Sequence, residues 1–370
     1  MVASDPLFVL TGSLNRPSSD GVPVRGQGVS VLRLDPASGT LHPVSVSDRI
    51  DNPTFVAGAA DGRTLYVTSE VETWDEGLVS AYRLDPATGQ LHYIDKQPSR
   101  GGAPAYLSLH PSGNWLFAAN YLVEAPALRP AQAVVVFPIE ADGGVGPAVA
   151  SASHSGHGPV AGRQDAPHPH CALASPDGRF VLVADLGLDQ IMVYPFDVQT
   201  GALGPGAAVA LTPGCGPRHM AFCAGGRWLV VVGEIDSTVR VLAWDAASGN
   251  LQPVSCQSLL SSSWRGEASG ADLAVSADNR FVYVSSRGPN VVVTLALDAE
   301  HGTLATLAHD AAPAKPRSLT LAGDFLLVAG QDGDRIAVLH RDMASGRLSD
   351  AGHWAAVGSP TCIRACLLRR

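Results

Sequence analysis

The phrase DAASGNLQP, residues 245–253, recurs in altered form at six other places in this 370-residue chain. Each copy sets an acidic residue, a short spacer and a glycine between two apolar runs. The seven glycines are spaced 44 to 58 residues apart, at Gly39, Gly89, Gly143, Gly201, Gly249, Gly302 and Gly346. Glycine supplies the positive φ that tight hairpin loops require. The phrase therefore predicts seven equivalent hairpin units.

A second phrase repeats at the same interval and has the form of a turn followed by an apolar strand. Examples are ASPDGRFVLVADL at 174–186 and FCAGGRWLVVVGE at 222–234. An alternating run such as STVRVLAWD, residues 237–245, lies between the two phrases. Each unit thus holds four strands, and helical periodicity never persists for three turns. Four antiparallel strands in each of seven units predict an all-β fold, the seven-bladed β-propeller.

The two ends of the chain together complete one of these units. The segment SPTCIRACLL at 359–368 matches NPTFVAGAA at 52–60, the first strand of a unit, and the N-terminus supplies the other three strands. We therefore expect one blade completed by both chain termini, because closing the ring leaves no unpaired edge. Two separate β-sandwiches are the alternative. The period never breaks, so residues 1–370 are predicted to form a single propeller domain.

Composition excludes several classes of function. The formal net charge is −9 and no block of Lys and Arg stands out, so we expect no nucleic-acid partner. No segment reaches 18 apolar residues, so we expect no membrane partner. The six cysteines lack any C-x-x-C pair, which favours buried, reduced thiols and a cytoplasmic location. We expect a monomer or a weak homo-oligomer.

Polar residues fall at one predicted rim of the propeller. In this fold the first strand of each blade lines the central channel, and its start lies beside the end of the antiparallel second strand. Aligning the units by their turns places the first-strand starts at Thr54, Ala105, His170, Arg218, Ala271, Arg317 and Thr361. The second-strand ends are Gly12, Glu70, Tyr121, Leu186, Glu234, Arg287 and Gln331. Charged groups from distant parts of the chain should therefore converge on one mouth of the channel.

The residue types at this mouth indicate an anionic ligand. Arg218, Arg287 and Arg317 outnumber the two acids, Glu70 and Glu234, and guanidinium offers a planar fork for phosphate or carboxylate. The structural alternative is that these groups only pair across blades or bind ordered water. They exceed what blade packing needs, and a concave rim on a stiff scaffold is a common place for binding groups.

A histidine-rich segment is the other candidate for chemistry. The stretch SHSGHGPVAGRQDAPHPH, residues 153–170, carries His154, His157, His168 and His170. Its spacing resembles a metal site, but its glycine and proline content indicates a loop, and no obvious set of acidic or cysteine ligands accompanies it. We expect no metal and no cofactor. Serine-nucleophile elbows and phosphate-binding glycine loops are absent from the sequence.

Four stretches together resemble the lactonase family of seven-bladed propellers. They are APHPHCALASPDGRFVLVADL, GCGPRHMAFCAGGRWLVVVGE, ADLAVSADNRFVYVSSRGPN and PRSLTLAGDFLLVAGQD, and the likeness runs from about residue 7 to 368. The family includes propeller-type 6-phosphogluconolactonases and fungal carboxymuconate cyclases. Where many relatives have a histidine in the second full blade, this chain has Ala105 and Tyr106.

The resemblance implies both a site and a reaction. It places the family's proposed active-site residues on His170, Arg218, Glu234 and Arg287. We expect these four to be catalytic in the hydrolysis of a small anionic sugar-acid lactone of the 6-phosphogluconolactone type. The expected substrate-binding residues are His168, His219, Arg317, Glu70, Tyr121 and Asp185. A carboxymuconate-type lactonising cycloisomerase and a non-catalytic propeller scaffold are the alternatives.

Overall fold

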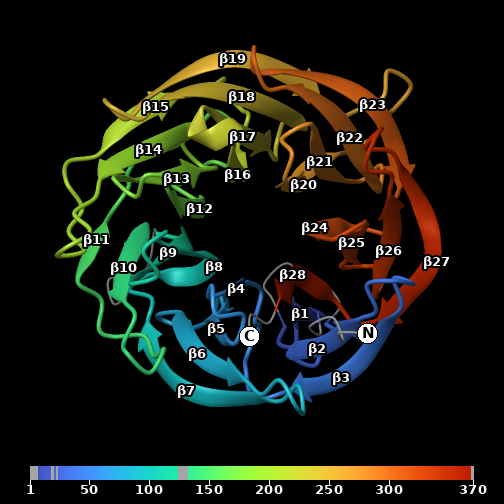
Figure 1. The fold of residues 1–370 in the computed structure, drawn as a ribbon. Coiled ribbons are helices and arrows are strands. Elements are labelled where there is room, and N and C mark those ends of the chain that lie inside the picture. The colour runs from blue at the N-terminus through green and yellow to red at the C-terminus, as the bar shows by residue number, and fades with distance from the viewer. Residues whose placement is uncertain (1–6, 18–20, 22–23, 124–131, 368–370) are drawn as a thin grey trace.

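The computed structural model describes residues 7–17, 21, 24–123 and 132–367, and they form seven four-stranded antiparallel sheets arranged around a central opening (Figure 1). This confirms the predicted seven-bladed propeller. Blade 1 holds β4 to β7, and blades 2 to 6 follow in chain order. In every blade the strand drawn nearest the centre is the first of its unit.

The strand bounds of the first three blades are as follows. Blade 1 consists of β4 (Val56–Gly58), β5 (Thr64–Ser69), β6 (Leu78–Leu84) and β7 (Leu91–Pro98). Blade 2 consists of β8 (Gly102–Leu109), β9 (Trp115–Leu122), β10 (Val134–Pro138) and β11 (Ala150–Ala152). Blade 3 consists of β12 (Pro169–Ala174), β13 (Phe180–Asp185), β14 (Gln190–Pro195) and β15 (Ala207–Ala210).

The next three blades repeat this arrangement. Blade 4 consists of β16 (Pro217–Cys223), β17 (Trp228–Gly233), β18 (Thr238–Asp245) and β19 (Asn250–Ser258), with a short 3₁₀ turn, η1 (Ala224–Gly226), between its first two strands. Blade 5 consists of β20 (Ser269–Val275), β21 (Phe281–Arg287), β22 (Val291–Asp298) and β23 (Thr303–Ala311). Blade 6 consists of β24 (Pro316–Ala322), β25 (Phe325–Gly330), β26 (Arg335–Arg341) and β27 (Leu348–Ala356).

The seventh blade joins the two ends of the chain, as predicted. Its strands are β28 (Pro360–Leu367), β1 (Leu7–Ser13), β2 (Val29–Leu34) and β3 (Leu41–Ser47), in that order from the channel outwards. Phe8 pairs with Cys366 and Gly12 pairs with Cys362 across the antiparallel β1–β28 ladder. Hydrogen bonds between the first and last strands therefore close the ring and remove the free edge.

The two repeated phrases meet between neighbouring blades, which explains why they recur at one interval. Gly249 lies in the β18–β19 loop with φ of 76°, and a Cβ there would lie 2.6 Å from the ring of Phe180 in the preceding blade. The same glycine-on-aromatic contact recurs in five blades, as Gly39 on Phe325, Gly201 on Trp115, Gly249 on Phe180, Gly302 on Trp228 and Gly346 on Phe281. Glycine is thus needed both for its backbone conformation and for the close approach of the next blade.

The apolar core lies between adjacent blades. The second strands are almost fully buried, and residues such as Val230 of β17 pack in one cluster with Val284 of β21. Burying each such side chain contributes roughly 1.5–3 kcal/mol, so the blades form a stiff wall around the channel. Among the described residues no helix is long and apolar enough to cross a membrane.

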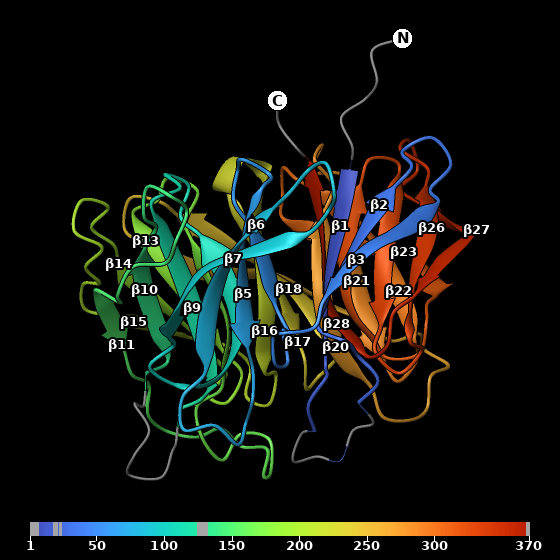
Figure 2. The same cartoon turned by 90° about the horizontal axis from the view of Figure 1, so that it is seen from below.

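The direction of the strands fixes which end of the channel carries the polar mouth. β1 begins beside the end of β28, where Leu7 pairs with Leu367, and its last residue, Ser13, pairs with Pro360 at the start of β28. The start of β28 therefore lies at the opposite end, together with loops such as residues 153–168 (Figure 2). Because the innermost strands all run in one direction, their starts share this end of the channel.

Candidate active site

A β-bulge marks the start of most innermost strands. The register shifts between Pro169 and Cys171, between Pro217 and Met220, and at the matching point of four further blades. The bulged residues are Ala105, His170, Arg218, His219, Ala271, Asp272, Arg317 and Thr361. A bulge leaves a residue outside the ladder and turns its side chain to a new direction. The bulges therefore turn side chains that differ from blade to blade towards the channel mouth.

Glu234 stands at the centre of the mouth, directly after β17. Its carboxylate Oε2 accepts hydrogen bonds from Arg218 Nε at 2.8 Å and pairs with Arg287 Nη2 at 2.9 Å. Its other oxygen, Oε1, accepts a hydrogen bond from Nη2 of Arg163. Although burial opposes ionisation, the surrounding guanidiniums hold the pKa of Glu234 well below its usual range. Glu234 is therefore a permanent carboxylate that gathers three arginines.

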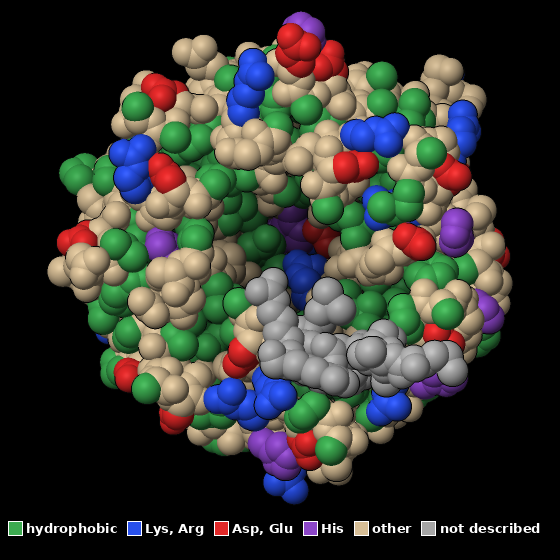
Figure 3. All heavy atoms as spheres, viewed as in Figure 1, with side chains coloured by type: hydrophobic (Ala, Val, Ile, Leu, Met, Phe, Trp, Pro, Cys, Tyr) green, Lys and Arg blue, Asp and Glu red, His purple; other side chains and the backbone are tan. Residues whose placement is uncertain are grey.

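Of the two inner arginines beside this acid, Arg218 is buried and Arg287 is partly buried. Arg218 is 2% exposed, and its Nη1 also donates to the carbonyl oxygen of Ala271 at 2.6 Å. Arg287 Nη2 donates to the carbonyl oxygen of Gly270 at 2.8 Å. Burial and the neighbouring cations lower the pKa of Arg218 to about 10, so it remains charged at neutral pH. Viewed down the channel, basic, acidic and histidine side chains gather at its base (Figure 3).

His170 is a neutral imidazole beside this charged group. Burial and the charge of Arg218 lower its pKa well below the usual value. Its ring meets His219 and Tyr121 edge to face, with centroid distances of 5.2 and 5.7 Å. His170 is 5% exposed, and its Nδ1 has no hydrogen-bond partner within the described part of the chain. A neutral imidazole at a channel mouth can accept a proton from a bound water.

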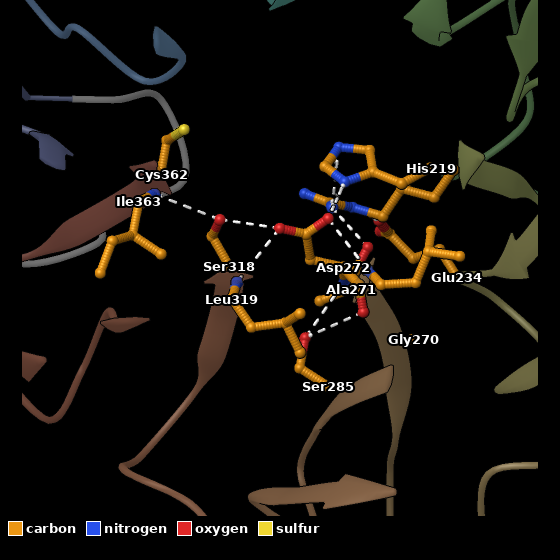
Figure 4. Close-up of polar contacts among 12 residues, drawn as sticks. His219, Glu234, Gly270, Ala271, Asp272, Ser285, Ser318, Leu319, Cys362 and Ile363 are labelled. Atoms are coloured by element: carbon orange, nitrogen blue, oxygen red, sulfur yellow. Dashed lines mark hydrogen bonds and ion pairs between the residues drawn. The ribbon is translucent and has the colours of Figure 1, made fainter. Parts of the chain in front are cut away.

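Behind the arginines, Asp272 anchors a second polar network (Figure 4). Its Oδ1 lies 2.7 Å from Nδ1 of His219, and its Oδ2 accepts hydrogen bonds from the hydroxyl of Ser318 at 2.8 Å and the amide of Leu319 at 3.1 Å. These donors keep the pKa of Asp272 low despite burial. An ionised Asp272 selects the tautomer of His219 in which Nδ1 carries the proton. Nε2 of His219 is then free to accept from Arg218 Nη1 at 3.1 Å.

The remaining predicted cation and acid complete the mouth. Arg317 Nη1 lies 3.4 Å from Oε1 of Gln331. The hydroxyl of Thr54 donates to Oε2 of Glu70, which follows β5. Burial raises the pKa of Glu70 and the charge of Arg317 opposes that rise. Arg317 also lowers the pKa values of His170 and Arg218, so its positive charge acts across the mouth.

Tyr121 and His168 form the wall next to His170. Their rings stack at a centroid distance of 4.4 Å with planes 14° apart, and His168 Nδ1 lies 2.9 Å from the carbonyl oxygen of Tyr121. On the other side of His219, Tyr106 packs at 5.0 Å from its ring and at 4.2 Å from that of Phe55. Tyr106 therefore adds an aromatic wall below the mouth.

Asp185, predicted to bind substrate, does not join the mouth group. It is fully buried, and its Oδ1 accepts backbone amides of His168, Gly187 and Leu188. Its Oδ2 lies 2.6 Å from Nδ1 of His154, whose Nε2 meets the hydroxyl of Tyr194 at 2.9 Å. With its oxygens occupied, Asp185 fastens the histidine-rich loop to blade 3. The described residues contain no group of three or more His, Cys, Asp or Glu placed to hold a metal ion.

Two residues of the site escaped the sequence analysis. Arg163 lies in the loop of residues 153–168, which is not part of the repeat, so the alignment of the units could not place it. Its side chain nevertheless contacts Glu234. Its neighbour Gln164 is fully buried and donates to Asp189 Oδ1 at 2.8 Å, which fixes the loop in place. Asp272 stands one position after the predicted strand start Ala271, as His219 does after Arg218 in the preceding blade, and this equivalence was the signal that could have predicted their contact.

Comparison with known proteins shows which family the chain belongs to. The family described as "Lactonase, 7-bladed beta-propeller" matches residues 10–365. The chain belongs to this family. The predicted resemblance to this family is thereby confirmed.

Individual relatives of this lactonase carry two related names. The 6-phosphogluconolactonase of Bacillus subtilis is 27% identical over 341 residues, which cover 91% of this chain and 94% of that relative. The 6-phosphogluconolactonase of Formosa agariphila is 29% identical, covering 87% and 91%. Among solved structures, the periplasmic gluconolactonase of Pseudomonas aeruginosa is 31% identical, with a TM-score of 0.87 and coverage of 98% of this chain and 100% of that chain.

Proposed function

We propose that the chain hydrolyses a sugar-acid lactone of the 6-phosphogluconolactone type at the channel mouth. The observation that carries the proposal is the set of three guanidiniums gathered by Glu234 beside the neutral His170. The names of its relatives support the same reaction. Lactone opening needs an activated water and stabilisation of the oxyanion that forms on the carbonyl oxygen, and this mouth offers a group for each.

The charge of the mouth favours an anionic substrate. Four arginines, Arg163, Arg218, Arg287 and Arg317, face two acids, of which Glu70 has a raised pKa and Glu234 a lowered one. This excess positive charge lies in a buried setting where electrostatic interactions are stronger than in water. A phosphate or carboxylate on the substrate would neutralise it.

In the reaction we assign proton transfer to His170. Its imidazole takes a proton from the attacking water as the new carbon–oxygen bond forms. The guanidiniums of Arg218 and Arg287 stabilise the negative charge on the carbonyl oxygen. When the ring carbon–oxygen bond breaks, the same proton passes to the leaving ring oxygen, which completes a hydroxy acid. An anionic substrate would raise the pKa of His170 and so strengthen it as a base.

Glu234 serves this chemistry by position rather than as a base. A carboxylate held by three guanidiniums has a low proton affinity, so it is a poor acceptor. The remaining members of the predicted binding set would contact the polyol part of the substrate or hold those that do. They are His168, His219, Arg317, Glu70 and Tyr121.

A cytoplasmic location is part of the proposal. All six cysteines are free thiols, five of them buried, which suits a reducing compartment. Because the relative from Pseudomonas aeruginosa is named periplasmic, fractionation of the source cells is the deciding measurement. Recovery in the periplasmic fraction would contradict this part.

The test of function is the rate of lactone opening by the purified protein. We expect hydrolysis of 6-phosphoglucono-1,5-lactone well above the spontaneous rate, with 6-phosphogluconate as the product in NMR spectra. A rate equal to the spontaneous one would contradict the proposal. Closure of a muconate to a lactone by the same preparation, without sugar-lactone hydrolysis, would instead establish a cycloisomerase.

A further inference from the structure

A cleft opens beside the mouth, where blades 5 and 6 meet the loop of residues 153–168. Its volume is about 650 Å³, enough for a substituent larger than a single water. Its charged and polar lining consists of Arg163, Glu267, Ser269, Arg287, Asn290, Lys315 and Asp332. Nothing in the mouth chemistry derived above uses Lys315, Asn290 or Ser269.

The cleft and the mouth share two guanidiniums. Arg163 and Arg287 both contact Glu234, and both also line the cleft. Their side chains are 43% and 12% exposed, so one edge faces the carboxylate and the rest is open to a ligand. A substrate whose ring sits beside His170 could therefore extend a substituent past these arginines into the cleft.

Lys315 provides a third cation at the far side. Its ammonium forms an ion pair with the carboxylate of Asp332 at 3.8 Å. The cleft thus gathers three cations, of which Arg163 and Arg287 also contact Glu234 and Lys315 also contacts Asp332. Lysine and arginine together form a common phosphate site, because the fork of arginine and the point charge of lysine reach different oxygens.

The backbone around Lys315 is held firmly in an unusual conformation. Its φ is 53°, in the left-handed region that non-glycine residues rarely adopt. Its amide donates to Asn290 Oδ1 at 2.8 Å, and its carbonyl oxygen accepts the amide of Gln331 at 3.0 Å. Two residues later, the bulge places Arg317 in the mouth. One strained turn therefore directs one cation to the cleft and another to the channel.

We propose that this cleft binds the phosphate monoester of a phosphorylated sugar lactone while the lactone ring occupies the mouth. The inference rests on the proposed function and adds a subsite that distinguishes phosphorylated from unphosphorylated lactones. That distinction matters because the relatives bear both 6-phosphogluconolactonase and gluconolactonase names. Lys315 and Arg163 are the residues that determine it.

The test compares two lactones in the variant Lys315→Gln. The measured quantity is kcat/KM for 6-phosphoglucono-1,5-lactone divided by kcat/KM for glucono-1,5-lactone. We expect this ratio to fall about tenfold, the effect of losing one charge-assisted hydrogen bond to phosphate. The matched control is Lys96→Gln in the outer strand β7, which should leave the ratio unchanged. An unchanged ratio in Lys315→Gln would overturn the subsite.

Inhibition by inorganic phosphate tests the same subsite in the unaltered protein. Phosphate held in the cleft should compete with the phosphorylated lactone and raise its KM. It should leave the KM of glucono-1,5-lactone within about twofold, since both can bind together. Equal competition with both lactones would place the anion in the mouth and refute the proposal. Failure to hydrolyse either lactone would instead refute the proposed function, so the two failures are distinguishable.

Discussion

The outer loops and the channel mouth use the same residue types for opposite purposes. In the outer loop of blade 4, Asp245 accepts the amide of Ala247 at 2.9 Å and the hydroxyl of Ser248 at 2.6 Å, and it is exposed to solvent. At the mouth of the same blade, Glu234 is 6% exposed and binds three guanidiniums. Both acids have lowered pKa values, but the causes differ. Hydrogen bonds within its own loop lower the pKa of Asp245, whereas arginines from other parts of the chain lower the pKa of Glu234.

The difference teaches how to separate scaffold from site in a repeat protein. The outer-loop acid recurs in nearly every blade because each blade needs the same turn. The mouth position changes from alanine to histidine to arginine around the ring, so it cannot serve a requirement shared by all blades. Residues that differ at equivalent positions, and that are buried and charged, are the ones to test for function.

The largest expected effect on activity comes from an arginine at the mouth, compared with an arginine in an exposed turn. Replacing Arg218 with alanine should lower kcat/KM for the phosphorylated lactone by about 10²–10³, because it removes a donor to the developing oxyanion. Arg179→Ala removes an exposed arginine that pairs with Asp177 in a turn, and activity should not change. Steady-state kinetics on both variants, with circular dichroism to verify folding, measure the contrast. Full activity in Arg218→Ala would contradict a catalytic role for the mouth.

A smaller effect is expected from the network behind the arginines. Asp272→Asn preserves shape but removes the charge that fixes the tautomer of His219 and, through it, the position of Arg218. We expect kcat to fall about 10- to 100-fold, as for other groups that orient a functional residue. KM should stay within about twofold. A variant that loses thermal stability but keeps kcat would show that Asp272 is only structural.

The pH dependence of activity tests the protonation state of His170 at the mouth. His170 must be neutral to accept a proton. Its lowered pKa keeps it neutral even at pH values below the usual pKa of histidine. The acid limb of kcat/KM, which reports the free enzyme, should therefore lie well below pH 6.5. Activity should stay nearly constant between pH 7.5 and 6.5. An acid limb centred at or above pH 6.5 would argue against His170 as the base.

The smallest effect on activity should come from the repeated scaffold. Gly249→Ala places a Cβ 2.6 Å from the ring of Phe180 at a φ of 76°, and we expect a loss of about 1–3 kcal/mol in unfolding free energy. Gly113→Ala has the same φ of 76° but open space, so it should lose less. Denaturant titration measures both, and kcat/KM should remain unchanged. Equal losses would mean that interblade contact adds nothing.

The sequence predicted the fold because every blade repeats the same chemistry. The closure by β28 and β1 followed from one matched segment, and the second-strand ends lie within one residue of their predicted positions. The charged residues of the mouth followed from the same alignment, since a ring brings equivalent positions together.

The features that the sequence did not predict depend on contacts that do not recur from blade to blade. The bulges that turn His170 and Arg218 into the mouth arise from how two strands pair, and the register of one strand alone does not reveal them. Arg163 reaches Glu234 from a loop that only buried contacts such as that of Gln164 define. Asp185 has the residue type of a ligand-binding group, but its burial against three backbone amides is a property of the folded chain.

A structure of the protein with bound 6-phosphogluconate tests the central claim most directly, namely that the non-repeated residues at the mouth are the site. We expect the carboxylate of this product beside Arg218, Arg287 and His170, with its phosphate next to Lys315. Product bound at the end of the channel where β1 begins, or in a groove between the outer strands, would contradict this assignment.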